Sequence, residues 1–203
     1  MLLRDLIGFG LFIGYFIAAG LPLILAKKVF KLPFEITRKM YHLLITLSIF
    51  PLLKLFSSWD MAVLAALLFA LMVYPILKLV EHTSFYKQIA VERKDGEFKS
   101  SLIIVQVSLA TLIFVFWGLM GDAWQYVAAV AVMAWGFGDA AAALVGKAIG
   151  RRQIQHRRIA GKKTVEGTLA MFVVAALAVF LTLQLYAGQP WHVSLLVALL
   201  VAP

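Results

Sequence analysis

Residues 136–167 read GFGDAAAALVGKAIGRRQIQHRRIAGKKTVEG and join one long apolar segment to the next. Asp139 lies in a run of glycine, alanine and other apolar residues, and Glu166 is a second carboxylate near the end of the stretch. Seven Lys and Arg residues lie between them, from Lys147 to Lys163. An ionised carboxylate among apolar residues is costly in hydrocarbon unless a cation or a metal accompanies it. The stretch therefore predicts a polar site at the junction of two membrane helices.

Small residues follow Asp139 at helical spacing. In a helix, Asp139, Ala143, Gly146 and Gly150 fall at i, i+4, i+7 and i+11, so the carboxylate heads a stripe of small side chains that another group can approach closely. The glycines and alanines taken alone are equally typical of a helix-packing face in a membrane protein. The aspartate favours a site.

The composition is that of an integral membrane protein. Of the 203 residues, 63% are apolar and only 14% are charged, which is too hydrophobic for an ordinary soluble domain. The net charge of +9 indicates basic loops beside anionic lipid or a polyphosphate ligand, and the loops lack the interleaved aromatic residues that favour nucleic acid as a partner. Cysteine is absent, which excludes disulfides, thiolate metal sites and cysteine nucleophiles.

Hydropathy predicts an all-α, polytopic bundle of about seven transmembrane helices in one membrane domain, residues 1–203. The predicted spans are 5–26, 40–56, 61–80, 101–117, 124–149, 165–186 and 191–203. The last segment would reach only about 20 Å as a helix, against a hydrocarbon core of about 30 Å. We therefore expect an incomplete last span and a chain truncated at its C-terminus.

Lys and Arg are unevenly distributed among the connections. Residues 27–39 hold five, 81–100 hold four and 147–163 hold seven, which is 16 of the 19 in the chain. The intervening connections hold none. Because cytoplasmic loops are enriched in Lys and Arg, this alternation predicts that the N-terminus lies outside and the basic loops lie in the cytoplasm. The polar clusters then all fall at cytoplasmic helix ends, where they could form one site.

Two of these clusters precede the opening stretch. Arg38, Lys39 and His42 lie at the start of the second predicted span, and Arg38 and His42 are i, i+4 neighbours. A snorkelling membrane anchor explains the two cations equally well, but it does not require the histidine. The second cluster surrounds Gly96 in a connecting loop, where a solvated turn is the simpler interpretation. Its candidate site residues are Glu92, Arg93, Glu97 and Lys99.

The third cluster combines cations and carboxylates. A polyphosphate needs cationic side chains and usually a divalent metal, and Lys162 and Lys163 with Asp139 and Glu166 offer both kinds of group. The start of a helix also favours an anion. Thr164 is placed to cap the sixth predicted helix, with Glu166 in its first turn.

These motifs resemble those of the CTP-dependent lipid kinase family, which contains dolichol kinase and phytol kinase and is related to the CDP-diacylglycerol synthases (phosphatidate cytidylyltransferases). Three elements carry the resemblance. They are R-K-x-x-H at Arg38, Lys39 and His42; an acidic and basic loop with G-E at Gly96 and Glu97; and G-D-A-x-A with G-x-x-x-G from Gly138 to Gly150, leading to K-K-T-x-E-G from Lys162 to Gly167. The third match is the strongest and the loop match is the weakest.

The resemblance implies transfer of a phosphoryl group from CTP to the hydroxyl of an isoprenoid alcohol or a related membrane lipid, with Mg²⁺ as cofactor. It implies that Asp139 binds the metal or orients the hydroxyl, that Lys162, Lys163 and Thr164 bind the triphosphate, and that Glu166 binds metal or holds the lysines. Arg38, Lys39 and His42 would contact the phosphates or the base. Such catalysis depends mainly on positioning and charge neutralisation.

Two alternatives stay open at this point. A phosphatidate cytidylyltransferase shares the K-K-T-x-E-G element and the metal requirement, but it attacks the α-phosphate of CTP with a phosphate acceptor. A lipid binder or transporter without chemistry is the other, although transporters usually place charged groups near the bilayer midplane. Family members also continue into an E-x-x-S-x-x-G-x-D-N-type segment after the last helix, which is not found before Pro203. The acceptor lipid and the oligomeric state are not predicted.

Overall fold

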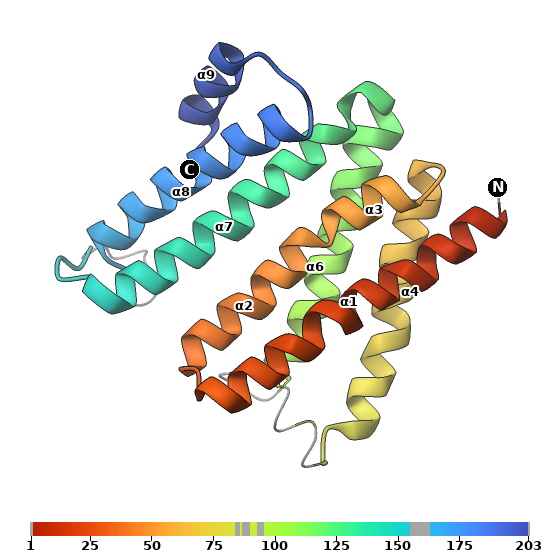
Figure 1. The fold of residues 1–203 in the computed structure, drawn as a ribbon, viewed down its shortest axis with the longest axis horizontal. Coiled ribbons are helices and arrows are strands. Elements are labelled where there is room, and N and C mark those ends of the chain that lie inside the picture. The colour runs from red at the N-terminus through yellow and green to blue at the C-terminus, as the bar shows by residue number, and fades with distance from the viewer. Residues whose placement is uncertain (1, 84–85, 87–89, 93–95, 155–162, 203) are drawn as a thin grey trace. The chain divides into compact units, whose positions relative to one another are not determined.

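The chain is built from helices in a computed structural model that describes residues 2–83, 86, 90–92, 96–154 and 163–202 (Figure 1). Over these residues the structure is helical and without strands, which confirms the all-α prediction. The chain divides into two compact units, Met1–Ala128 and Ala129–Pro203.

Among the described residues, five helices are long and apolar enough to cross a membrane, so a membrane protein is the class that the fold supports. These are α1 (Leu2–Phe30), α4 (Trp59–Val80), α6 (Glu97–Ile113) continued by the π-helix η1 (Phe114–Leu119), α7 (Gln125–Ile149) preceded by the 3₁₀ turn η2 (Asp122–Trp124), and α8 (Val165–Leu185). The other two predicted spans are shorter helices. They are α2 (Phe34–Leu47) with α3 (Ile49–Leu55), and α9 (Trp191–Val201).

The second predicted span is interrupted at Ser48, between α2 and α3. Pro51 explains the break, because proline has no N–H to donate to the carbonyl four residues earlier and its ring crowds that carbonyl, which belongs to Leu47. The Ser48 hydroxyl instead donates to the carbonyl of Ile45 at 2.6 Å. Pro22 and Pro75 lie inside the continuous helices α1 and α4, so a proline in the sequence does not by itself predict where a helix is interrupted.

In the first unit, α2 and α3 together run back along α1 (Figure 1). Near the start of α1, both carboxylate oxygens of Asp5 accept hydrogen bonds from Ser57, one from its backbone N–H and one from its hydroxyl, each at 2.8 Å. Further along, the Tyr15 hydroxyl donates to the carbonyl of Leu44 at 2.6 Å. The α2–α3 pair thus covers most of the length of α1.

Aromatic rings hold α1 against α4 in the same unit. Phe16 and Phe69 are stacked with their centroids 4.3 Å apart, and Phe12 meets both rings edge to face. Phe12 is fully buried, and its ring also lies 6.4 Å from that of Phe56. Such edge-to-face and stacked pairs add stability beyond that of the buried apolar area, so this cluster stabilises the packing of α1 against α4.

In the second unit, α7 and α8 lie side by side and antiparallel, and α9 packs against α8 (Figure 1). Gly138 is the point of closest approach in the middle of the pair, where an added Cβ atom would lie 3.2 Å from Ala175 and 3.3 Å from Met171. Gln184 joins α8 to α9 by donating to the Ser194 hydroxyl at 3.0 Å, and it also donates to the carbonyl of Gln189 in the connection at 2.7 Å.

Candidate functional site

Two of the predicted clusters line the same small polar cavity in the first unit. Arg38 and His42 come from α2, and Glu97 comes from the first turn of α6. The cavity has a volume of about 90 Å³. Its other lining residues are Tyr41, Ile45, Val91, Phe98, Ser101, Leu102 and Val105. A basic and an imidazole side chain therefore meet a carboxylate that lies more than 50 residues further along the sequence.

Lys39 has a different environment from its neighbour Arg38. One residue along a helix is a rotation of about 100°, and Lys39 is not part of the cavity wall. Its side chain is buried, with 3% of its surface exposed. Arg38 forms an ion pair with Glu35 at 3.2 Å, one turn earlier on the same helix. The R-K-x-x-H element thus divides into a cavity-lining pair, Arg38 and His42, and a buried lysine.

The predicted loop residues mainly tie the loop to the helices. Glu92 accepts a hydrogen bond from the backbone N–H of Phe98 at 3.2 Å, which satisfies one of the free N–H groups at the start of α6. Lys99 forms an ion pair with Glu81 at the end of α4. Arg93 lies outside the described residues. Of this group, Glu97 is the residue that lines the cavity.

Gly96 begins α6 in a left-handed conformation, with φ of +79°. Other residues are strained there by about 1–2 kcal/mol. Gly96→Ala is therefore expected to lower the free energy of unfolding by that amount, measured by thermal unfolding in detergent. Gly14→Ala is the control, because Gly14 lies within α1 and an added Cβ atom there meets no atom within 4 Å. Equal thermal midpoints for the two variants would contradict the prediction.

A larger, apolar cavity of about 320 Å³ adjoins the polar one. The two share the wall residues Tyr41, Ile45, Phe98 and Leu102. The remaining lining residues are Ile13, Phe16, Ile17, Gly20, Leu21 and Ile24 of α1, Leu44 of α2, and Phe69, Val73 and Leu77 of α4. Sequence reasoning did not find this cavity, since apolar residues at helical spacing look the same whether they face a cavity or a neighbouring helix.

In the second unit, the start of α8 is built as the sequence predicts. The Thr164 hydroxyl accepts a hydrogen bond from the backbone N–H of Gly167 at 3.1 Å, so Thr164 caps the helix, and Glu166 lies in the first turn. Thr164 also pairs with Gln153 in an antiparallel bridge. Thr164 is buried, with 8% of its surface exposed, and its hydroxyl is used in capping the helix. This favours a structural role for Thr164 over direct contact with a nucleotide.

The glycines of the two motifs let α7 approach Thr164. A Cβ atom on Gly150 would lie 2.2 Å from the Gly146 carbonyl oxygen and 2.6 Å from the Thr164 methyl group. One on Gly167 would lie 2.8 Å from the Ala142 carbonyl oxygen. The packing interpretation of the small residues is therefore confirmed for these glycines, and the group that approaches their face is the start of α8.

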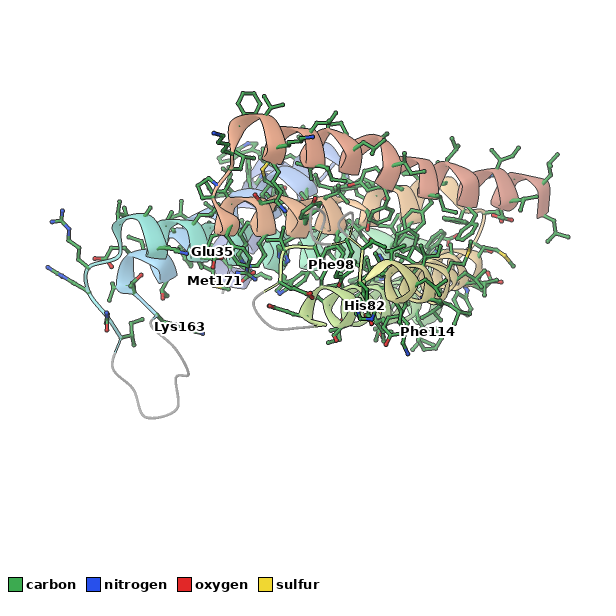
Figure 2. All side chains as sticks on the ribbon, turned by 90° about the horizontal axis from the view of Figure 1, so that it is seen from below. Glu35, His82, Phe98, Phe114, Lys163 and Met171 are labelled. Atoms are coloured by element: carbon green, nitrogen blue, oxygen red, sulfur yellow. The ribbon has the colours of Figure 1, made fainter. Side chains whose placement is uncertain are left out.

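Glu166 and Lys163 lie at this end of the α7–α8 pair, where Figure 2 shows Lys163. Both carboxylate oxygens of Glu166 accept from the backbone N–H of Arg152 at 3.3 Å. Lys163 is exposed, and Lys162 lies outside the described residues. The arrangement presents an exposed cation and a carboxylate held by the neighbouring backbone.

Asp139 lies deeper along the helix pair than Glu166. Its neighbour Gly138 is level with Met171, five residues beyond Glu166, which is about 7.5 Å along the axis of α8. Side chains tilt towards the start of their own helix, so in this antiparallel pair the two carboxylates tilt away from each other. Among the described residues, no group of three or more His, Cys, Asp or Glu side chains could hold a metal ion. Asp139 and Glu166 therefore lie at different depths along the helix pair.

Comparisons of the chain with protein-family models, with curated protein sequences and with solved structures return no match.

Proposed function

We propose that this protein transfers the γ-phosphoryl group of CTP to the hydroxyl of a membrane isoprenoid alcohol or a related lipid. In that reaction the bond between the γ-phosphorus and its bridging oxygen breaks, a bond from the lipid oxygen to phosphorus forms, the hydroxyl proton leaves and CDP is released. The joined polar and apolar cavities carry the proposal. A lipid alcohol requires just such a pair, an apolar space for its chain next to polar groups for its hydroxyl.

The triphosphate is assigned to the start of α8, where helix N–H groups and an exposed lysine favour an anion. Mg²⁺ in such enzymes is usually held by one or two carboxylates together with the substrate phosphates, so a single carboxylate fits the requirement. Glu166 is proposed as that ligand, and Asp139 is proposed either as a second ligand or as the group that orients the lipid hydroxyl. When bound, the ion would neutralise charge on the phosphates.

The proposed topology has the N-terminus outside and the three basic loops in the cytoplasm. Because α2 and α3 cover most of the length of α1, we propose that they cross the membrane together as a second span. Their 22 residues from Phe34 to Leu55 reach about 33 Å, which suffices for a hydrocarbon core of about 30 Å. With this span included, residues 27–39 and 81–100 fall on the same side, as their shared basic character requires.

The position of the label in CTP distinguishes the reactions. The purified protein is incubated with Mg²⁺, labelled CTP and separate samples of phytol, a polyprenol, diacylglycerol and phosphatidate. We expect label from the γ-position in a lipid monophosphate. Label from the α-position in a CDP-lipid would instead establish a cytidylyltransferase, and no transfer from either position with any acceptor would contradict both enzymatic proposals.

Lys163→Ala tests the assignment of the triphosphate. Hydrogen bonds to charged groups contribute about 1.5–3 kcal/mol, so loss of this lysine is expected to weaken CTP binding about tenfold or more. Arg157→Ala removes the same charge from the basic connection and is expected to have little effect. Equilibrium binding of labelled CTP measures both. Equal losses would mean that only the overall positive charge of the connection matters.

A further inference from the structure

We propose that the apolar cavity of the first unit holds the hydrocarbon chain of the acceptor, that the Tyr41 hydroxyl binds the acceptor's hydroxyl, and that Gly20 keeps the cavity open. The inference rests on the proposed function in taking the ligand to be a lipid alcohol. It adds where the hydrocarbon chain of the lipid binds and how many such hydrocarbon chains the site accepts.

The cavity has the form of a channel along α1. Its α1 wall runs from Ile13 to Ile24, twelve residues whose ends are about 16 Å apart along the helix axis. The stacked rings of Phe16 and Phe69 lie at one end, backed by the fully buried Phe12. Such a closely packed aromatic cluster does not move aside easily. A hydrocarbon chain that enters the channel therefore ends or turns outwards at this point.

Tyr41 lies in the wall that the apolar and polar cavities share. Its hydroxyl is buried and has no hydrogen-bond partner among the described residues. A buried, unsatisfied hydroxyl costs about 1–3 kcal/mol, so a ligand that completes the bond gains correspondingly. A lipid hydroxyl can both donate and accept, and it would lie next to Arg38 and Glu97 of the polar cavity.

One side of the channel is accessible from the bilayer. Ile17 and Leu21 of α1 line it and are 55% and 53% exposed, so a hydrocarbon chain can enter from the side of the channel. A volume of about 320 Å³ is at the lower end of the range for ligand pockets, which favours one chain over two. Because lipid chains are as apolar as the channel walls, selectivity must come from shape and from the hydroxyl.

Gly20 offers a direct way to fill the channel. It lies in the middle of the α1 face that lines the cavity, and a Cβ atom added there meets no heavy atom within 4 Å. Leucine in its place would project into the channel and would also raise helix propensity, so the variant is expected to fold. Gly10 is the matched control, since it is exposed on the same helix, has equally open surroundings and does not line the cavity.

The test is photolabelling of the full chain in phosphatidylcholine nanodiscs. The probe is a phytol analogue with a diazirine in the middle of its chain, and labelled peptides are identified by mass spectrometry. We expect labels on the channel faces of α1 and α4, and we expect unlabelled phytol to compete. Gly20→Leu should reduce this labelling about tenfold or more, as expected for a filled apolar pocket, whereas Gly10→Leu should leave it unchanged.

Tyr41→Phe provides an independent readout. Loss of one hydrogen bond is expected to lower labelling by the alcohol probe about two- to tenfold. A second probe with the same chain but no hydroxyl should label this variant as strongly as the alcohol probe does, whereas it should label the wild-type protein less strongly. Labelling that phytol does not displace, or that spreads equally over exposed residues such as Leu71 and Leu79, would mean that bulk lipid fills the space and would overturn the proposal.

The kinase and the channel can fail separately. Labelling that Gly20→Leu abolishes, in a protein that transfers no phosphoryl group from CTP, would uphold the channel and overturn the kinase. Full phosphoryl transfer and undiminished labelling in Gly20→Leu would overturn the channel and uphold the kinase.

Discussion

Asp139→Asn is expected to reduce CTP-dependent phosphorylation of a lipid alcohol about a thousandfold, the upper range for the loss of one group that stabilises a transition state. Asn has the same shape as Asp but no charge, so the helix and its packing are retained. Asp139 is half-buried in α7, beside the line of glycines that meets α8. An ionised group in that position is costly unless a cation, a metal or hydrogen bonds accompany it.

Single-turnover transfer of γ-label measures this effect, and Asp60→Asn is the control. Asp60 is also an acidic residue of an apolar helix, but it is exposed in the first turn of α4. CTP binding in the Asp139 variant then separates the two proposed roles. A metal ligand predicts weaker Mg²⁺-dependent CTP binding, whereas a residue that orients the lipid hydroxyl predicts unchanged binding. Turnover at the wild-type rate would exclude both roles.

Gly150→Ala is expected to destabilise the second unit by about 3 kcal/mol, at the upper end for an overpacked site. The new methyl group would lie 2.2 Å from the Gly146 carbonyl oxygen and 2.6 Å from the Thr164 methyl group. The first contact is with backbone, which cannot rotate out of the way. The Thr164 cap of α8, and with it the position of Glu166, should be disturbed at the same time.

Thermal unfolding in detergent measures this change, with an expected fall in the midpoint of about 6–12 °C for a chain of this size. Gly10→Ala is the control, because its surroundings are open and alanine favours a helix. An unchanged midpoint for Gly150→Ala would mean that the end of α7 is not packed against Thr164. Loss of CTP binding without loss of stability would instead assign Gly150 a direct role at the site.

The fold class could be predicted because it depends on local properties of the chain. Long apolar runs predict the helices, and a threonine before Val165 predicts the cap that the structure confirms. The interruption at Ser48 was not predicted, because a single proline such as Pro51 can either end a helix or lie within one, as Pro22 and Pro75 do.

The candidate site could be predicted only in part, because residue types do not reveal directions. Arg38 and His42 meet Glu97 at one cavity, whereas the adjacent Lys39 is turned away from it. Glu92 and Lys99 have the charges expected of a site, yet they bond to the start of α6 and the end of α4. A charged residue in the sequence indicates that its side chain needs a partner, but only the fold shows which group is close enough to be that partner.

The sequence by itself determined that this is a helical membrane protein with polar clusters at its helix ends, because hydrophobicity and charge act through composition and spacing. Only the tertiary structure decided that α1, α2, α4 and α6 leave an apolar channel beside a polar cavity, and that Asp139 and Glu166 lie at different depths. A cavity forms where the side chains of packed helices leave space between them. The depths of the two carboxylates depend on the register of α7 against α8. Both are properties of packed pairs of helices rather than of any one segment.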